Sequence, residues 1–159
     1  MIDVKVVADK NNKCVMKHLS RLDQHYKSGI HEAYIVIGEY LKRTNKEDFR
    51  AKKSGRFYRI RVNGRIINHR ASGPFEPPAR LTGALERTIK TKTSGFNKME
   101  YSAGGGRVNY AGYLENGTSK EDGNSKMEPR PYMSKAIRDN EGKTVITFYR
   151  QIGRRLQCV

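Results

Sequence analysis

The feature that most constrains the fold of this chain is a long apolar stripe near its N-terminus. Between Val15 and Arg43, apolar side chains recur at steps of three and four residues. This spacing places them on one face of an α-helix, although Gly29 weakens the pattern locally. The sequence therefore predicts one long amphipathic helix that packs across a sheet formed by later residues. Its expected inward face comprises Leu19, Leu22, Tyr26, Ile30, Ala33, Ile37, Tyr40 and Leu41, and its outward face comprises Lys17, Arg21, Lys27 and Glu39.

Other segments carry strand and hairpin signals. Asn63-Gly64 lies between two apolar runs rich in β-branched residues, a pattern typical of a tight hairpin turn, so we expect strands over residues 56–62 and 65–69. A triple glycine between residues 96–102 and 107–110 predicts a second hairpin. Residues 2–6 alternate apolar and polar side chains, as in a short half-buried strand. Residues 43–55 are polar and basic, and we expect a loop or a frayed helix end there.

The C-terminal half carries helix signals separated by loops. Thr82 is expected to cap a short helix through Ile89. Tyr110 and Leu114 share one face of a helical turn, which Gly117 ends by adopting the left-handed conformation. Segment 119–126 has no large apolar residue to bury, so we expect a mobile loop. Pro131 suits the first position of a further helix. This helix is expected over residues 132–156, with an interruption at residues 139–142. Its expected inward face comprises Met133, Ala136, Ile137, Val145, Phe148, Ile152 and Leu156.

Together these signals predict a single α+β domain over residues 1–159. We expect a small, mainly antiparallel sheet packed by a long N-terminal helix and a C-terminal helix, with an extended hairpin and a mobile loop. The length suffices for one domain with a core of its own but is short for two.

Positive charge is abundant and unevenly distributed. The chain has 32 Lys and Arg against 16 Asp and Glu, for a formal net charge of +16. Eleven of these cations fall between Lys42 and Arg70, where only Glu47 and Asp48 oppose them. Such a run is often only a solvated surface, but it also suits a surface that faces the phosphates of DNA. The basic candidates for a DNA channel or a partner contact are Arg56, Arg59, Arg61 and Arg65.

No pattern of catalytic or metal-binding residues emerges. No Gly-Lys-Ser/Thr sequence follows the triple glycine, which argues against a nucleotide site. His18 and His25 share a helical face without a carboxylate or cysteine placed to complete a set. Cys14 and Cys158 have no metal-ligand spacing. We therefore expect no enzymatic activity, no cofactor and no metal, and a reducing compartment, with pairing of the two terminal cysteines left open.

Membrane insertion and secretion are not expected either. The chain has no run of about eighteen apolar residues, and its N-terminus lacks the apolar stretch of a secretory signal. The sequence thus predicts a soluble protein made in a cytoplasm, with no membrane partner.

Two separated blocks resemble a family of bacteriophage neck proteins. Residues 110–118 and 127–136 (YAGYLENGT and MEPRPYMSKA) are similar to the family pattern YA-x-x-x-E-x-GT followed by M-x-x-RPF-x-x-x-A. Residues 69–78 and 82–89 (HRASGPFEPP and TGALERTI) are similar to H-x-A-S-x-PG-E-PP followed by TG-x-L-x-x-SI. Phe75 stands where the family usually has glycine, and Thr88 where it usually has serine.

The resemblance implies a structural protein of a tailed-phage virion. Family members are head-tail connector proteins, also called neck or tail-completion proteins, and the chain would form a closed ring of six copies. The ring would join head connector or adaptor proteins to tail terminator or tail tube proteins and would surround the passing double-stranded DNA. It would reside in the virion neck after assembly in the host cytoplasm. Ring-interface candidates are Asn63, Gly64, Tyr110, Glu115, Thr118 and Arg130.

The sequence leaves open the role of the hairpin arginines and an alternative function. The arginines of the first hairpin can line the ring lumen or pair with acidic patches on neighbouring rings. A sequence-independent nucleic-acid-binding protein is the alternative function, and it would hold duplex DNA with a steep salt dependence. A basic toxin or nuclease would need a titratable cluster that the sequence does not display.

Overall fold

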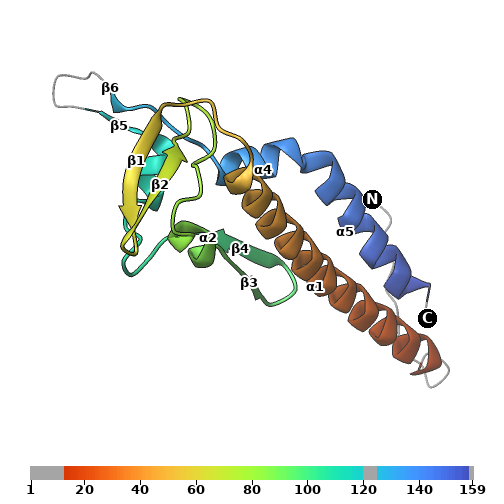
Figure 1. Cartoon of the computed structure of the whole chain (residues 1–159). Coiled ribbons are helices and arrows are strands. Elements are labelled where there is room, and N and C mark those ends of the chain that lie inside the picture. The colour runs from red at the N-terminus through yellow and green to blue at the C-terminus, as the bar shows by residue number, and fades with distance from the viewer. Residues whose placement is uncertain (1–12, 120–124, 158–159) are drawn as a thin grey trace.

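The computed structural model describes residues 13–119 and 125–157 and has a mixed helix and strand architecture (Figure 1). The expected strand at residues 2–6 lies outside these ranges. The helices are α1 (Lys13–Arg50), α2 (Ala84–Thr88), α3 (Ala111–Asn116), α4 (Met133–Asp139) and α5 (Glu141–Leu156). The strands are β1 (Phe57–Val62), β2 (Arg65–Arg70), β3 (Lys90–Ser94), β4 (Lys98–Ser102), β5 (Thr118–Ser119) and β6 (Ser125–Met127).

Helix α1 confirms the long N-terminal helix and extends it. Of the loop or frayed helix end expected over residues 43–55, residues up to Arg50 are helical, because Asn45 and Phe49 continue the buried stripe of Leu41 at steps of four residues. The main partner of α1 is α5, which lies along it (Figure 1), and β3 packs against α1 near Gly38. Only the middle and the end of the expected inward face are buried. Leu19 and Tyr26 are exposed.

The strands pair into three separate two-stranded antiparallel ladders, where the sequence predicts a single small sheet. The first hairpin, β1–β2, is confirmed: Asn63 and Gly64 both have positive φ (48° and 78°), as a tight turn of this kind requires. The second expected hairpin is wrong, because β4 pairs with β3. Half-buried Thr91 and Thr93 explain the choice, since the alternation of Thr with Lys makes 90–94 an amphipathic strand beside α1. The triple glycine forms only an isolated bridge between Gly105 and Val108.

The C-terminal region consists of two helices that meet at Asn140. The Asn140 amide donates to the carbonyl of Ala136 (2.8 Å), and its Oδ1 accepts from the Tyr40 hydroxyl of α1 (2.7 Å). Helix α4 begins at Met133, so Pro131 precedes the helix and does not occupy its first position. Ala136 and Ile152 are buried as expected, whereas Ile137, Val145 and Leu156 are exposed.

Two buried clusters form the core. One combines Phe49 of α1 with Tyr132, whose ring centroid lies 5.4 Å away, and adds Leu85, Ile89, Val108 and Ala111. The other joins Ile37 and Leu41 of α1 to Ala136 of α4. Tyr101 of β4 packs against both clusters, and its hydroxyl accepts a hydrogen bond from the side-chain amide of Asn45 and donates one to the carbonyl of Leu41. The core thus lies where α1, β4 and α4 meet, and it leaves the β1–β2 hairpin outside.

The short helices agree with the sequence in place and differ in their ends. The Thr82 hydroxyl accepts from the backbone N–H of Ala84 (3.3 Å), but Gly83 is the residue that precedes α2. Gly117 ends α3 with φ 75° and ψ −176°, a positive-φ conformation that lies outside the left-handed helical region and is essentially restricted to glycine. No helix in the described part of the chain is long and apolar enough to span a bilayer.

Candidate functional site

The strand register divides the β1–β2 hairpin into two chemically different faces. Side chains that are paired across the strands point to the same side of the hairpin. One side, the arginine face, consists of the pairs Phe57–Arg70, Arg59–Asn68 and Arg61–Ile66. The other side, the apolar face, consists of Tyr58–His69, Ile60–Ile67 and Val62–Arg65. Arg65 is therefore separated from Arg59 and Arg61, although all three are exposed.

The arginine face offers cations that are not neutralised within the described chain. The side chains of Arg59 and Arg61 make no ion pair or hydrogen bond with any residue in the ranges 13–119 and 125–157. Arg70 is held in place: its guanidinium donates to the carbonyls of Gly55 (3.0 Å) and Ser54 (3.2 Å) and lies 4.9 Å from the centre of the Phe57 ring. Carbonyl partners orient this charge without cancelling it. The hairpin therefore carries positive charge that an external anion can meet.

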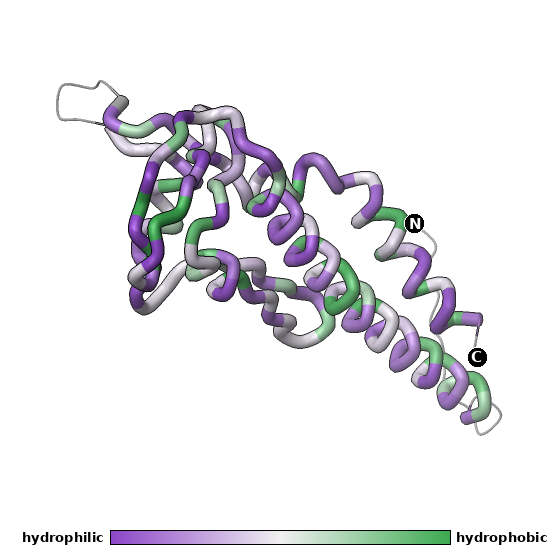
Figure 2. The backbone as a smooth tube through the Cα atoms, in the orientation of Figure 1, coloured by the Kyte–Doolittle hydropathy of each residue, from purple (hydrophilic) through white to green (hydrophobic). Residues whose placement is uncertain are grey.

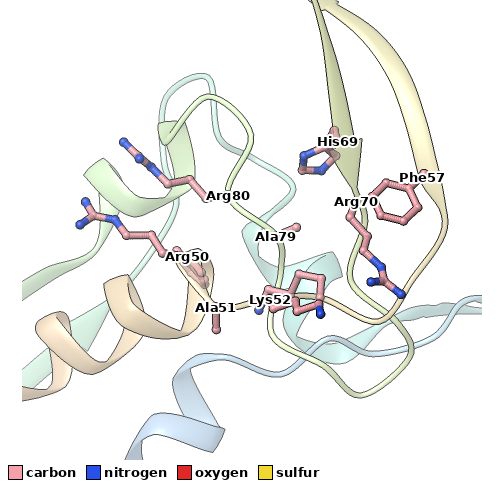
Figure 3. Close-up of a pocket in the computed structure, with 10 residues that line it drawn as sticks. Arg50, Ala51, Lys52, Phe57, His69, Arg70, Ala79 and Arg80 are labelled. Atoms are coloured by element: carbon pink, nitrogen blue, oxygen red, sulfur yellow. The ribbon is translucent and has the colours of Figure 1, made fainter.

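A basic cleft of about 470 Å³ adjoins the base of the hairpin (Figure 3). Arg50 and Arg80 lie on one side of it, and Phe57, His69 and Arg70 lie on the other. Both Arg50 and Arg80 pair with the largely buried carboxylate of Glu86, each at 2.8 Å. Lys52 lines the cleft from an exposed position.

Lys53 is a buried cation that lines this cleft. Its ammonium donates to the carbonyl of Asp48 (2.6 Å), and burial lowers its pKa despite the nearby carboxylates of Glu76 and Asp48. Arg80 lies outside the basic run of the sequence and reaches the cleft because its backbone N–H donates to the carbonyl of Phe49 (2.9 Å). No local sequence pattern predicts this long-range hydrogen bond between Arg80 and Phe49.

The ring-interface candidates near α3 lie in a tightly bonded junction. The Glu115 carboxylate accepts from the backbone N–H groups of Tyr132 (2.9 Å), Met133 (3.1 Å) and Ser134 (2.9 Å) and from the Ser134 hydroxyl (2.5 Å). Burial opposes ionisation of Glu115, but these hydrogen bonds outweigh it and hold its pKa below the ordinary value. Glu115 thus caps α4 within the chain.

The other candidates surround this junction. The Arg130 N–H donates to the carbonyl of Leu114 (2.7 Å), and Thr118 pairs with Met127 in the β5–β6 ladder. Tyr110 is 40 % exposed, and Leu114 packs against the core. By contrast, Asn63 and Gly64 are exposed at the hairpin tip. The structure therefore separates the two groups of candidates: one group stabilises the fold, and the other is free to make contacts.

Glu76 plays a similar structural role that the sequence reading missed. Its Oε2 accepts from the backbone N–H of Gly73 (2.7 Å) and from the backbone N–H and hydroxyl of Ser54 (3.0 Å each). Burial works against its ionisation, but the hydrogen bonds hold the pKa below the ordinary value. A carboxylate flanked by prolines in an extended connector is the signal that could have revealed it.

The two motif blocks contact each other in space. Phe75, in the first block, donates its backbone N–H to the carbonyl of Pro129 in the second (2.8 Å). Phe75 has φ 60° and is 66 % exposed, so its backbone occupies the left-handed region that favours glycine. This is the position at which the resembling family usually has glycine.

The comparisons with known proteins provide no further identification. No protein-family model, no curated protein and no solved structure matches this chain. Within the described ranges, no group of three or more His, Cys, Asp and Glu side chains can hold a metal ion. The site is thus best described as a protruding cationic hairpin with an adjoining basic cleft.

Proposed function

We propose that this chain is a structural subunit of the neck of a tailed bacteriophage. Six copies form a ring between the head connector or adaptor proteins and the tail terminator or tail tube proteins. The ring extends the DNA channel and helps to retain the packaged genome in the virion, and it assembles in the host cytoplasm. The proposal rests on the two motif blocks, which occur in the family order.

The fold is compatible with such a role in one specific respect. The β1–β2 hairpin presents Arg59 and Arg61 to its surroundings without partners in the described chain, outside the core. Duplex DNA carries one phosphate charge per about 1.7 Å, so exposed arginines can interact with it without reading bases. A lumen-facing hairpin would hold DNA loosely and allow it to slide.

Purified virus particles provide the test. The chain should be present in them, and electron microscopy should place it in a closed ring at the head-tail junction. Particles with Arg59→Glu and Arg61→Glu should assemble but lose genome retention or delivery. Lys17→Glu with Arg21→Glu makes the same change in net charge at exposed positions of α1 and should have little effect. Absence of the protein from particles would refute the proposal, and unchanged infectivity of the hairpin variant would refute the lumen assignment alone.

The alternative is a sequence-independent nucleic-acid-binding protein, which the basic cleft beside the arginine face favours. Such a protein should bind duplex DNA as a monomer. Removing Arg59 and Arg61 should then lower the slope of log affinity against log salt by about 2, since each phosphate contact contributes about 0.9. A neck subunit should bind free DNA weakly and show no such slope.

A further inference from the structure

The apolar face of the hairpin is only partly covered within the described chain. Ile60 and Val62 are half-buried, Ile67 is 37 % exposed, and Tyr58 is 50 % exposed. The strands pack against each other, and no other helix or strand makes an extensive contact with either of them. Figure 2 shows hydrophobic segments along this hairpin, which lies at one end of the molecule. Because a two-stranded hairpin is only marginally stable in water, a face like this gains from a partner.

The same chain contains an apolar groove at a different place. It has a volume of about 560 Å³ and lies between α1, β4 and the α4–α5 pair. Its lining includes Ile37, Leu41, Met99, Ile137, Val145 and Phe148, and no lining residue is charged. A concave surface without charge is unusual in a chain with a net charge of +16. Exposed Ile137 and Val145 leave its rim open to solvent.

We propose that the apolar face of one copy inserts into the groove of a second copy. The apolar face of the hairpin is rich in β-branched residues, whereas the groove is a hollow lined mainly by aliphatic and aromatic side chains. In Figure 1 the hairpin lies apart from the α1–α5 pair, so the two halves of the contact are separate surfaces of one chain. A contact between two different patches is head-to-tail and repeats from copy to copy, which is how closed rings arise.

Electrostatics favour a second copy as the occupant. Two strongly cationic chains can associate only where their charges stay apart. The register turns Arg59 and Arg61 away from the apolar face, and the groove contributes no cation. Arg65 is the one hairpin arginine on the apolar face, and its position at the hairpin tip leaves it at the edge of the contact. The arginine face then stays free for DNA. The inference thus deepens the proposed ring function and rests on it.

Matched pairs of neighbouring residues allow a direct test by analytical ultracentrifugation of the full chain. Ile67→Asp alters the apolar face, and Ile66→Asp alters the opposite face of the same strand. Val145→Asp alters the groove rim, and Ile146→Asp alters an adjacent exposed position of α5 that does not line the groove. The wild-type chain and the Ile66 and Ile146 variants should associate as concentration rises. The Ile67 and Val145 variants should remain monomeric, with native circular dichroism.

Mixing the two defective variants gives the decisive result. Ile67→Asp keeps an intact groove, and Val145→Asp keeps an intact hairpin, so the mixture should form heterodimers and nothing larger. A wild-type chain that stays monomeric at all concentrations, a loss of association in the matched controls, or a mixture that stays monomeric would each overturn the inference. Association in this assay with absence from virus particles would instead refute the phage function and leave the contact intact.

Discussion

The junction around Glu115 and the β1–β2 hairpin contrast sharply in how their polar groups are used. At the junction, one carboxylate receives four hydrogen bonds and joins α3 to the start of α4. On the hairpin, the side chains of Arg59 and Arg61 make no hydrogen bond or ion pair within the described chain. No helix or other strand makes an extensive contact with the two strands. Charged groups that are satisfied internally serve the fold, whereas those left outside are available to a partner. The following predictions test this division.

The largest effect should come from removing the Glu115 carboxylate. Glu115→Ala leaves three backbone N–H groups and a hydroxyl without their acceptor, and we expect a loss of about 2–4 kcal/mol in the free energy of unfolding. Urea unfolding followed by circular dichroism measures it. Glu128→Ala, at an exposed glutamate two residues before the junction partner Arg130, is the control and should change stability little. If Glu115→Ala lowered the free energy of unfolding only slightly, the Glu115 carboxylate would not stabilise the fold more than the hairpin arginines do.

Gly117 should be nearly as sensitive, because it has positive φ and no room for a side chain. A Cβ there would lie 2.7 Å from the carbonyl oxygen of Met127 and 3.0 Å from the nitrogen of Pro129. Gly117→Ala should therefore destabilise the fold by about 1–3 kcal/mol. Gly112→Ala within α3 meets no atom within 4 Å and should stabilise it by up to about 1 kcal/mol. The midpoint temperature of thermal unfolding should fall for Gly117→Ala and rise for Gly112→Ala.

Acid should lower the stability that the Glu115 and Glu76 carboxylates provide. The folded-state pKa values of Glu115 and Glu76 are both depressed from 4.5, so the unfolded chain binds more protons than the folded chain below about that pH. Their stabilising contribution is complete above the ordinary pKa and is lost as pH falls through the folded pKa. Unfolding curves measured from pH 6 to pH 3 should show this decline. Glu115→Gln should make the decline shallower, and an unchanged slope would contradict the assignment.

A smaller gain in stability is expected at Phe75. Its left-handed backbone costs a residue with a Cβ about 1 kcal/mol, and its exposed ring contributes little burial. Phe75→Gly should relieve this strain and raise the free energy of unfolding by roughly 0.5 kcal/mol after the entropic cost of glycine. Phe75→Ala retains a Cβ and should bring no such gain. Equal effects of the two substitutions would show that the backbone is not strained there.

The smallest effect on stability is expected on the hairpin. Arg59→Ala and Arg61→Ala remove exposed side chains without internal partners, so the free energy of unfolding should change by no more than about 0.5 kcal/mol. Urea unfolding measures this change. A loss of unfolding free energy comparable to that of Glu115→Ala would mean that the hairpin arginines also stabilise the fold, and the hairpin would then not differ from the Glu115 junction in this respect.

The sequence reading succeeded where the signal was local. The positions of α1 and of the β1–β2 hairpin follow from apolar spacing and from Asn63-Gly64. The basic run also located the arginines of the hairpin. The prediction from sequence was wrong about the strand that pairs with residues 98–102 and about the C-terminal end of α1, because contacts with distant residues decide both. The bonding of Glu115 to the start of α4, seventeen residues away, is a long-range contact of the same kind, and its place at a ring contact stays a prediction.

The amino-acid sequence by itself determined the helical periodicity, the tight turn at Asn63-Gly64, the strong positive charge and the two motif blocks. Only the tertiary structure decided which strands pair, that Arg80 joins Arg50 at the basic cleft, and that Glu76 and Glu115 act as internal acceptors. The physical reason is range. Periodicity and turn conformation depend on residues a few positions apart, whereas strand pairing, clefts and buried carboxylates depend on which distant segments the packed core brings together.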